Sequence, residues 1–191
     1  MGNSTSQPNA QRLREKLVGL GRIEQHKVAV QWAIENNCAI DMFGVFARER
    51  HLLLFQSGNE CENWIDTSAN LVYKMNMLVH VGENILKLFE RVELYNSLFP
   101  STALQFVGLH IAGVANAYPV FTQPFVDGAR FATNSEILEY MESLGFKALD
   151  SEGVFCDGYI LLRDVKPKNV LVSECSGAVF VIDADAERVG E

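Results

Sequence analysis

The sequence has no long apolar run, no cysteine pairing pattern and no excess of basic residues. A membrane-spanning helix needs ~20 apolar residues in a row, whereas apolar stretches here, such as 177–182, have the length of buried strands. The four cysteines are far apart with no histidine near them, so the sequence suggests neither a zinc site nor a disulfide framework and favours reduced thiols. The net charge of -8 argues against non-specific nucleic-acid binding, which needs clustered Lys and Arg. We therefore expect a soluble, cytoplasmic protein with neither membrane nor nucleic acid as a partner.

What the sequence does contain is enough apolar material for a core. Its 191 residues are 48% hydrophobic and include 12 phenylalanines. This length suits one domain, or two small lobes that share a cleft. The first nine residues are polar and lack the basic and apolar regions of a secretion signal.

Hydrophobic spacing predicts helices first and then a mixture of strands and helices. Apolar residues at three-to-four spacing predict two helices within 11–36, separated near Gly19 and Gly21. Thr133 to Glu136 has the pattern of a capping box that opens another helix. A long helix is expected at 82–99, and strands are expected at 51–55, 61–66, 71–77, 104–112, 118–126, 159–162, 170–172 and 178–182.

One polar segment near the end of the chain has the spacing of a phosphoryl-transfer loop. Asp164 is followed by Lys166 and Asn169, and a predicted hairpin then leads to Asp183. Protein kinases use a loop with Asp and, five residues later, Asn, followed by a strand pair that ends in a second Asp. The alternative is a polar turn between strands, ended by a capping Asp. The full spacing favours the kinase-like interpretation.

A lysine in the first half of the chain supports the same interpretation. Lys74 lies within the apolar strand 71–77, which would bury its stem and direct its ammonium group into a cleft. A kinase lysine in this position pairs with a glutamate of the following helix. The candidates are Glu90 and Glu93, and a helical step of 100° per residue favours Glu93, at the border of the apolar stripe.

Together these segments resemble a known family. The resemblance rests on five segments: the strand that contains Lys74, residues 94–100, residues 119–125, residues 164–169, and the pair Ile182-Asp183. The chain resembles the serine/threonine/tyrosine polyvalent protein-kinase-like domains of bacteria and their mobile elements, over roughly residues 51–185.

The resemblance implies roles for the residues of the loop. Asp164 would be the catalytic carboxylate and Lys166 would steady the transferred phosphoryl group. Asn169 and Asp183 would hold Mg²⁺. Asp185 would be either an additional acidic ligand or a solvated residue.

It also implies a nucleotide site. Lys74 would contact the phosphates of ATP and Glu93 would orient Lys74. Gln123 to Phe125 would form the hinge, where backbone groups meet the adenine. The alternative is that this segment is a core strand followed by its turn, because such a strand would show the same sequence pattern.

The sequence departs from the kinase pattern in three places. Gly58 stands alone where kinases have several glycines. Leu162 replaces the usual His, and Ala184 follows Asp183 where kinases have Phe-Gly. The sequence ends eight residues after Asp183, so we expect the helical acceptor platform to be reduced.

We therefore predict an α+β, protein-kinase-like fold. It comprises an N-terminal helical extension (1–50), an N-lobe with a small antiparallel sheet and one long helix (51–126), and a truncated C-lobe (127–191). The predicted function is Mg²⁺-dependent phosphoryl transfer from ATP, or from GTP, to a hydroxyl group of a protein or a small molecule. The alternative is a pseudokinase that serves as a nucleotide-binding or protein-interaction module.

Overall fold

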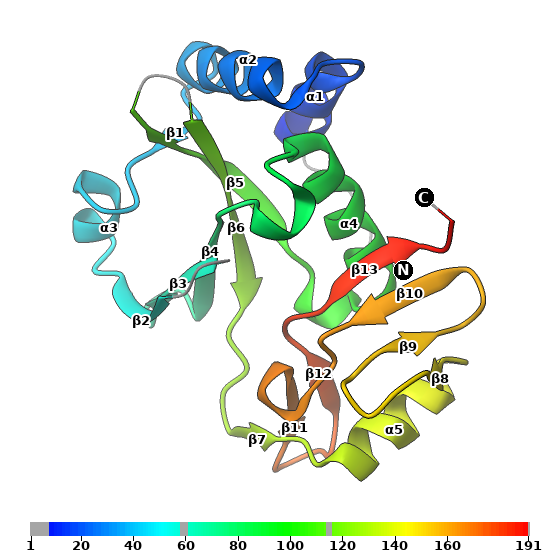
Figure 1. The fold of residues 1–191 in the computed structure, drawn as a ribbon. Helices are drawn as coiled ribbons and strands as arrows, with labels where there is room; N and C mark the ends of the chain where they lie inside the picture. Colours follow the sequence, from blue (N-terminus) through cyan, green and yellow to red (C-terminus); the bar gives the residue numbers. More distant parts are fainter. Residues whose placement is uncertain (1–7, 58–60, 114–115, 191) are drawn as a thin grey trace. The chain divides into compact units, whose positions relative to one another are not determined.

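The computed structural model describes residues 8–57, 61–113 and 116–190. Over these residues it has five α-helices and sheets of six, four and three strands (Figure 1). This mixed composition agrees, at a coarse level, with the expected kinase-like class.

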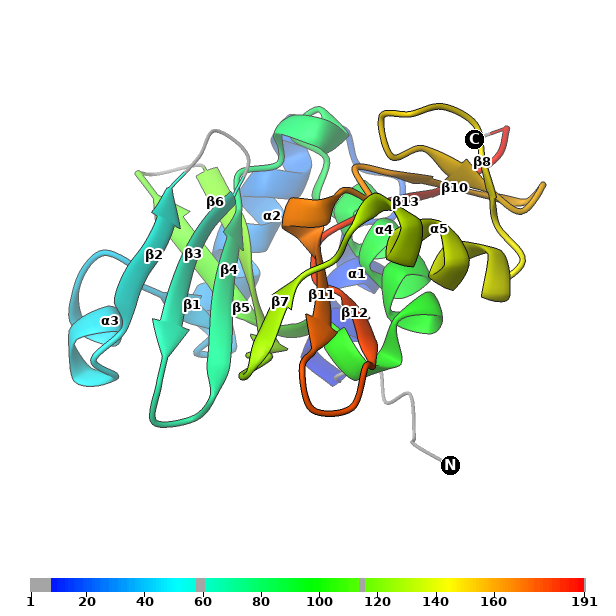
Figure 2. The ribbon, with the colours of Figure 1, turned by 90° about the horizontal axis from the view of Figure 1, so that it is seen from below.

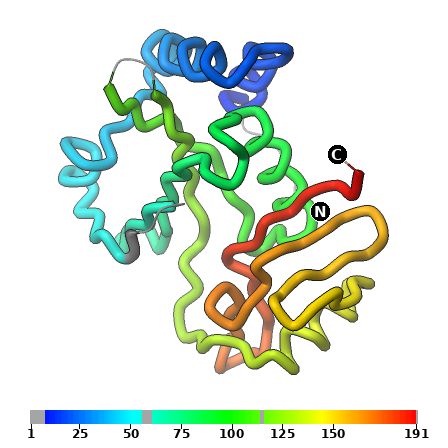
Figure 3. The backbone as a smooth tube through the Cα atoms, in the orientation of Figure 1, coloured from blue at the N-terminus to red at the C-terminus, as the bar shows by residue number. Residues whose placement is uncertain are grey.

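The chain forms two compact units. Unit 1 consists of Met1–Glu90 and Leu104–Phe125, and unit 2 of Arg91–Ala103 and Val126–Glu191. The chain, traced in Figure 3, therefore passes between the units after Glu90, after Ala103 and after Phe125.

The six-stranded sheet belongs to unit 1 and has the order β1-β5-β6-β4-β3-β2. The predicted strands are confirmed, but β1 was not predicted and it pairs in parallel with β5, so the sheet is not purely antiparallel. The strands are β1 (Ala39–Ile40), β2 (Leu53–Ser57), β3 (Cys61–Asp66), β4 (Leu71–Asn76), β5 (Gln105–Ala112) and β6 (Asn116–Pro124).

Two buried polar side chains attach the N-terminal helices to this sheet. The helices are α1 (Pro8–Leu17) and α2 (Arg22–Glu35), followed by the short α3 (Val45–Glu49). His26 of α2 accepts the Ala117 N–H of β6 on Nδ1 at 3.1 Å, so Nε2 donates to the Glu83 carbonyl, also at 3.1 Å. Gln25 accepts the Leu86 N–H at 3.1 Å. Helix α2 is thus bonded to β6 and to the start of the long helix.

The long helix α4 (Ile85–Leu98) presents the apolar stripe that its sequence predicts. Every member of the stripe is buried, and Phe99 and Pro100 end the helix as expected. The stripe consists of Ile85, Leu88, Phe89, Val92, Tyr95 and Phe99. Phe89 packs edge-on against Phe106 and Phe121 of the unit 1 sheet, with ring centroids 5.2 and 5.9 Å away.

Unit 2 has two small sheets and one helix of its own. Helix α5 (Asn134–Ser143) begins with the predicted capping box of Thr133 and Glu136. Figure 2 shows β7, β11 and β12 side by side, in the order β12-β11-β7, and the other sheet has the order β13-β10-β9-β8. The strands are β7 (Ala129–Phe131), β8 (Lys147–Ala148), β9 (Phe155–Cys156), β10 (Ile160–Arg163), β11 (Val170–Ser173), β12 (Val179–Val181) and β13 (Asp185–Arg188).

Candidate functional site

Asp164 follows directly on β10 and adopts a left-handed backbone conformation, with φ of 58°. Such a conformation is uncommon for residues other than glycine, although Asp tolerates it better than most. The chain turns sharply there, and the short helix η3 (Pro167–Asn169) then leads into β11. The left-handed Asp164 and the helix η3 therefore define the path of the loop between β10 and β11.

Three side chains of the loop surround the Asp164 carboxylate. Asn169 Nδ2 donates to Asp164 Oδ2 at 2.7 Å and to the Asp164 carbonyl at 2.8 Å. Lys166 Nζ lies 3.1 Å from Oδ1 and Lys168 Nζ lies 3.3 Å from Oδ2. Asn169 is buried, which holds its amide in one orientation. The loop thus brings Asp164, Lys166 and Asn169 together, as the sequence predicts.

These neighbours determine the protonation of the loop. Burial raises the pKa of the Asp164 carboxyl, but hydrogen bonds from Lys166 and Asn169 and the charge of Lys168 outweigh it, so this pKa lies below its usual value. The hydrogen bond to Asp164 raises the pKa of Lys166, and the charges of Asp164, Glu152 and Asp150 raise it further. At neutral pH the loop therefore presents a carboxylate beside an ammonium group.

Asp183 follows β12, the strand next to β11. The Ile182 N–H donates to the Asn169 carbonyl at 2.9 Å, and Val170 pairs with Val181. Asp183 is therefore the next residue after the one that is bonded to Asn169. Its side chain is exposed and makes no hydrogen bond or ion pair with the described part of the chain.

Two buried hydroxyl groups hold β12 and were not predicted as part of the site. Tyr95 Oη donates to the Val181 carbonyl at 2.7 Å and Thr102 Oγ1 donates to the same oxygen at 2.6 Å. Tyr95 lies in α4, and Thr102 ends the short helix η2 (Pro100–Thr102). One indication of this was present in the amino-acid pattern: a tyrosine in an otherwise apolar stripe, whose buried hydroxyl needs a partner.

A glycine supports the loop from its other side. The Val165 N–H donates to the Gly153 carbonyl at 3.0 Å, and a Cβ at Gly153 would lie 2.7 Å from the Val165 carbonyl oxygen. Gly153 has φ of +83°. Only glycine combines this conformation with so close a backbone approach.

Lys74 lies in the middle of the unit 1 sheet, on β4. Its cross-strand partner on β6 is Phe121, so both side chains are on the same face of the sheet. Phe121 contacts Phe89 of α4, so this is the face on which the start of α4 packs. Lys74 is half-buried, as expected for a lysine with its stem on an apolar sheet.

The two candidate partners of Lys74 both lie on α4, and both are exposed. Glu90 is the last residue of unit 1 in this helix, and Glu93 belongs to unit 2. Glu93 follows Phe89 by four residues and therefore lies on the same side of the helix. The choice of Glu93 stays a prediction.

Gln123 and Phe125 lie where β6 ends. Gln123 is buried and pairs with Val72 of β4. The Phe125 N–H donates to the Asn70 carbonyl at 3.0 Å. A role of Phe125 in adenine binding would therefore use its carbonyl or its ring, and the hinge stays a prediction. Gly58, the lone glycine of the expected phosphate loop, lies outside the described residues.

The donor atoms at Asn169 and Asp183 fit a hard cation. Mg²⁺ prefers oxygen ligands and is usually held by one or two carboxylates together with phosphate oxygens and water. The Asn169 amide oxygen accepts no hydrogen bond from any described residue, and Asp183 supplies a carboxylate. Within the described ranges, no three His, Cys, Asp or Glu residues form a metal-binding group by themselves. Two oxygen donors with phosphates completing the shell therefore suit Mg²⁺ better than a metal held by protein alone.

No helix of the described residues is long and apolar enough to cross a membrane.

Comparison with known proteins assigns the chain to a family. No curated protein matches the chain significantly. A family model described as "Serine/Threonine/Tyrosine Kinase found in polyvalent proteins" matches residues 22–188, which include most of both units and the whole Asp164 loop. The chain therefore belongs to this family of kinases from polyvalent proteins.

Proposed function

We propose that this chain transfers the γ-phosphoryl group of ATP to a hydroxyl group in a Mg²⁺-dependent reaction. The observation that carries the proposal is the Asp164 loop, in which one carboxylate is held by Asn169 and Lys166 beside the strand that leads to Asp183. Membership in a kinase family supports phosphoryl transfer in general. In this proposal unit 1 serves as the N-lobe and unit 2 belongs to the C-lobe.

Asp164 would orient the acceptor hydroxyl. Its lowered pKa keeps it ionised at neutral pH, so it accepts a hydrogen bond from the hydroxyl and directs the oxygen toward the phosphorus. Lys166, charged beside it, would stabilise negative charge on the transferred group. Positioning and charge neutralisation of this kind supply most of the catalysis in phosphoryl transfer.

Asn169 and Asp183 would hold the metal, and Lys74 would bind the nucleotide phosphates. When bound, Mg²⁺ would neutralise charge on the phosphate oxygens. Glu93 would orient Lys74, and the segment Gln123 to Phe125 would contact the base.

Nucleotide binding is tested by thermal unfolding with ATP and Mg²⁺, with GTP and Mg²⁺, and with each component alone. A ligand at 100 times its Kd adds about 2.7 kcal/mol of stability. For a protein of this size that raises Tm by about 2–4 °C per kcal/mol. Absence of a shift with either nucleotide would refute the proposal.

Transfer is tested with γ-labelled ATP and three kinds of acceptor: the chain itself, a mixture of denatured proteins and a mixture of polyols. Asp164→Asn keeps the shape of the side chain but removes its charge, and we expect a loss of about 10²–10⁴-fold in kcat with binding retained. The matched control is Asp157→Asn, because Asp157 caps the turn before β10 and lies outside the site. Equal activity of Asp164→Asn and wild type would refute the role of Asp164.

The same experiment separates the alternative function. A chain that binds the nucleotide but transfers no label to any acceptor, and forms no ADP, would be a nucleotide-binding pseudokinase. Labelled protein or labelled polyol would identify the class of acceptor.

A further inference from the structure

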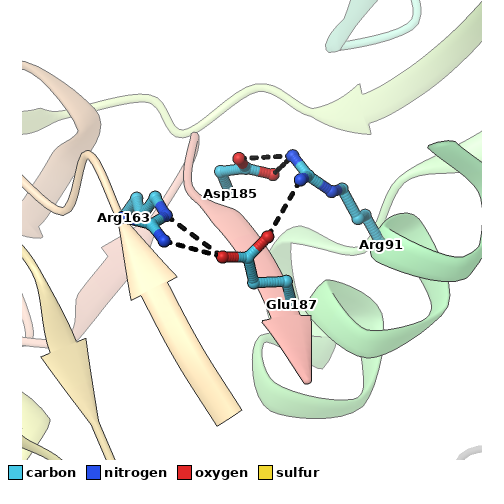
Figure 4. Close-up of polar contacts among 4 residues, drawn as sticks. All are labelled: Arg91, Arg163, Asp185 and Glu187. Atoms are coloured by element: carbon cyan, nitrogen blue, oxygen red, sulfur yellow. Dashed lines mark hydrogen bonds and ion pairs between the residues drawn. The ribbon is translucent and has the colours of Figure 1, made fainter. Parts of the chain in front are cut away.

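Four charged side chains of unit 2 form one connected network (Figure 4). Arg91 of α4 donates from Nη1 to both carboxylate oxygens of Asp185, at 2.5 Å each. Its Nη2 donates to Glu187 Oε2 at 3.0 Å. Arg163 of β10 donates to Glu187 Oε1 from Nε at 3.2 Å and from Nη2 at 2.8 Å. Two positive and two negative charges are therefore balanced within the network.

Strand pairing explains why three of these side chains lie on one face. β10 and β13 are antiparallel, and Arg163 is directly opposite Asp185. Glu187 is two residues further along β13, so it lies on the same face. Leu162 and Ala186 alternate with these residues and are buried on the opposite face. Arg91 approaches the charged face from α4 (Figure 4).

Arg91 is the most enclosed member of the network. Its side chain is 12% exposed, compared with 26% for Asp185 and 50% for Arg163. Its Nε is buried and has no hydrogen-bond partner among the described residues. A long side chain that loses its hydration and leaves one donor unsatisfied is a costly means of stabilisation. A positional role accounts for this geometry better than stability does.

The positions of the four residues along the chain indicate that role. Asp185 comes two residues after Asp183, and Arg163 immediately precedes Asp164. Both oxygens of Asp185 accept hydrogen bonds from Arg91, so in this arrangement Asp185 anchors α4 to β13. The network therefore joins α4 to the two strand ends that carry Asp164 and Asp183.

We propose that Arg91 is a positioning residue, which fixes β13 and the end of β10 so that Asp183 and Asp164 keep their relative placement during transfer. This inference rests on the proposed function. Arg91 touches neither nucleotide nor acceptor in this role. It acts through Asp185 and Glu187.

The first test needs no nucleotide. Arg91→Met keeps the apolar stem and removes the guanidinium group, and amide hydrogen exchange is measured by mass spectrometry. We expect exchange in β13 to accelerate about tenfold or more. Arg91→Lys keeps the charge without the planar fork, so it should give an intermediate value. Arg130→Met is the matched control, because it removes an arginine from the Glu136 ion pair elsewhere in unit 2.

The second test measures the reaction. Displacement of catalytic groups by about 1 Å lowers rates by about 100-fold, so Arg91→Met should lower kcat about 10- to 100-fold with little change in the KM of ATP. Arg91→Lys should recover part of kcat, and Arg130→Met should behave like wild type. Asp183→Asn should raise the Mg²⁺ concentration for half-maximal activity more than Asp185→Asn does.

The outcomes separate this inference from the proposed function. If wild type transfers phosphate and Arg91→Met changes neither exchange in β13 nor kcat, the inference is overturned and the proposed function stands. A requirement for Mg²⁺ that rises as much in Asp185→Asn as in Asp183→Asn would also overturn it, since Asp185 would then be a ligand. If wild type transfers no phosphate, the proposed function fails, and the catalytic part of the inference fails with it. The exchange result then still decides whether Arg91 holds β13.

Discussion

The carbonyl oxygen of Val181 allows a quantitative test of how β12 is held. The Ile182 N–H bonds to Asn169, so Val170 and Val181 form a non-hydrogen-bonded pair, and the Val181 carbonyl points away from β11. β12 is the edge strand of its sheet, so no further strand reaches this oxygen. Among the described residues, the hydroxyl groups of Tyr95 and Thr102 donate hydrogen bonds to it.

Removing one donor leaves the other in place, and removing both leaves a buried carbonyl unsatisfied. A buried hydrogen bond contributes about 1 kcal/mol, so Tyr95→Phe and Thr102→Val should each lower the free energy of unfolding by about 1 kcal/mol. The double variant should lose a further 1–3 kcal/mol or so, because an unsatisfied buried acceptor carries that cost. The total of about 3–5 kcal/mol exceeds the sum of the single effects.

The assay is urea unfolding followed by far-UV circular dichroism for all four members of the double-mutant cycle. Tyr140→Phe is the control, since the half-buried Tyr140 hydroxyl makes no hydrogen bond with the described residues. Additive effects, to within about 0.5 kcal/mol, would show that the two hydroxyl groups act independently and would refute the shared-acceptor argument.

Two further variants test local features of unit 2. The hydrogen bond from Arg130 is the main cause that lowers the pKa of Glu136 from 4.5 to about 2. The ionised Glu136 carboxylate therefore stabilises the folded state above pH 4.5, and this stabilisation is lost as the pH falls toward 2. Glu136→Gln should remove this part of the acid dependence, and a carboxyl that titrates near 4.5 by NMR would contradict it. Gly153→Ala should lower the free energy of unfolding by about 1–3 kcal/mol, because residue 153 has a left-handed backbone conformation. The contact of the new Cβ with the Val165 carbonyl oxygen should lower it further. Gly177→Ala is the control, with φ of +70° but no atom within 4 Å, and equal losses in thermal unfolding would show that the contact is irrelevant.

Local patterns in the sequence predicted the main elements of this fold. The apolar stripe of α4 and the capping box of α5 depend on contacts within a few residues, which periodicity records. β1 escaped prediction because a strand of two residues has no periodicity of its own. Its parallel partner β5 lies about 70 residues away, so no local signal connects them.

The loop of the candidate site was predictable because its residues are close in sequence. Asp164 and Asn169 are five residues apart, and the structure joins their side chains by a hydrogen bond. The supporting residues were not predictable, since Arg91 and Asp185 are 94 residues apart. An arginine in a helix is also typical of a solvated face. The alternation of acidic residues with Ala186 in β13 was the available signal, because it places Asp185 and Glu187 on one side of a strand.

The division of α4 between the two units has a practical consequence for dissecting this protein. A fragment that starts at Val126, at the last crossing of the chain, would contain the whole Asp164 loop. It would lack Arg91, Tyr95 and Thr102, so the Asp185 carboxylate and the Val181 carbonyl would lose the partners that the structure gives them. The strands beside the loop therefore receive contacts from a helical segment far upstream, and a cut between α4 and β5 would separate the Asp164 loop from that segment.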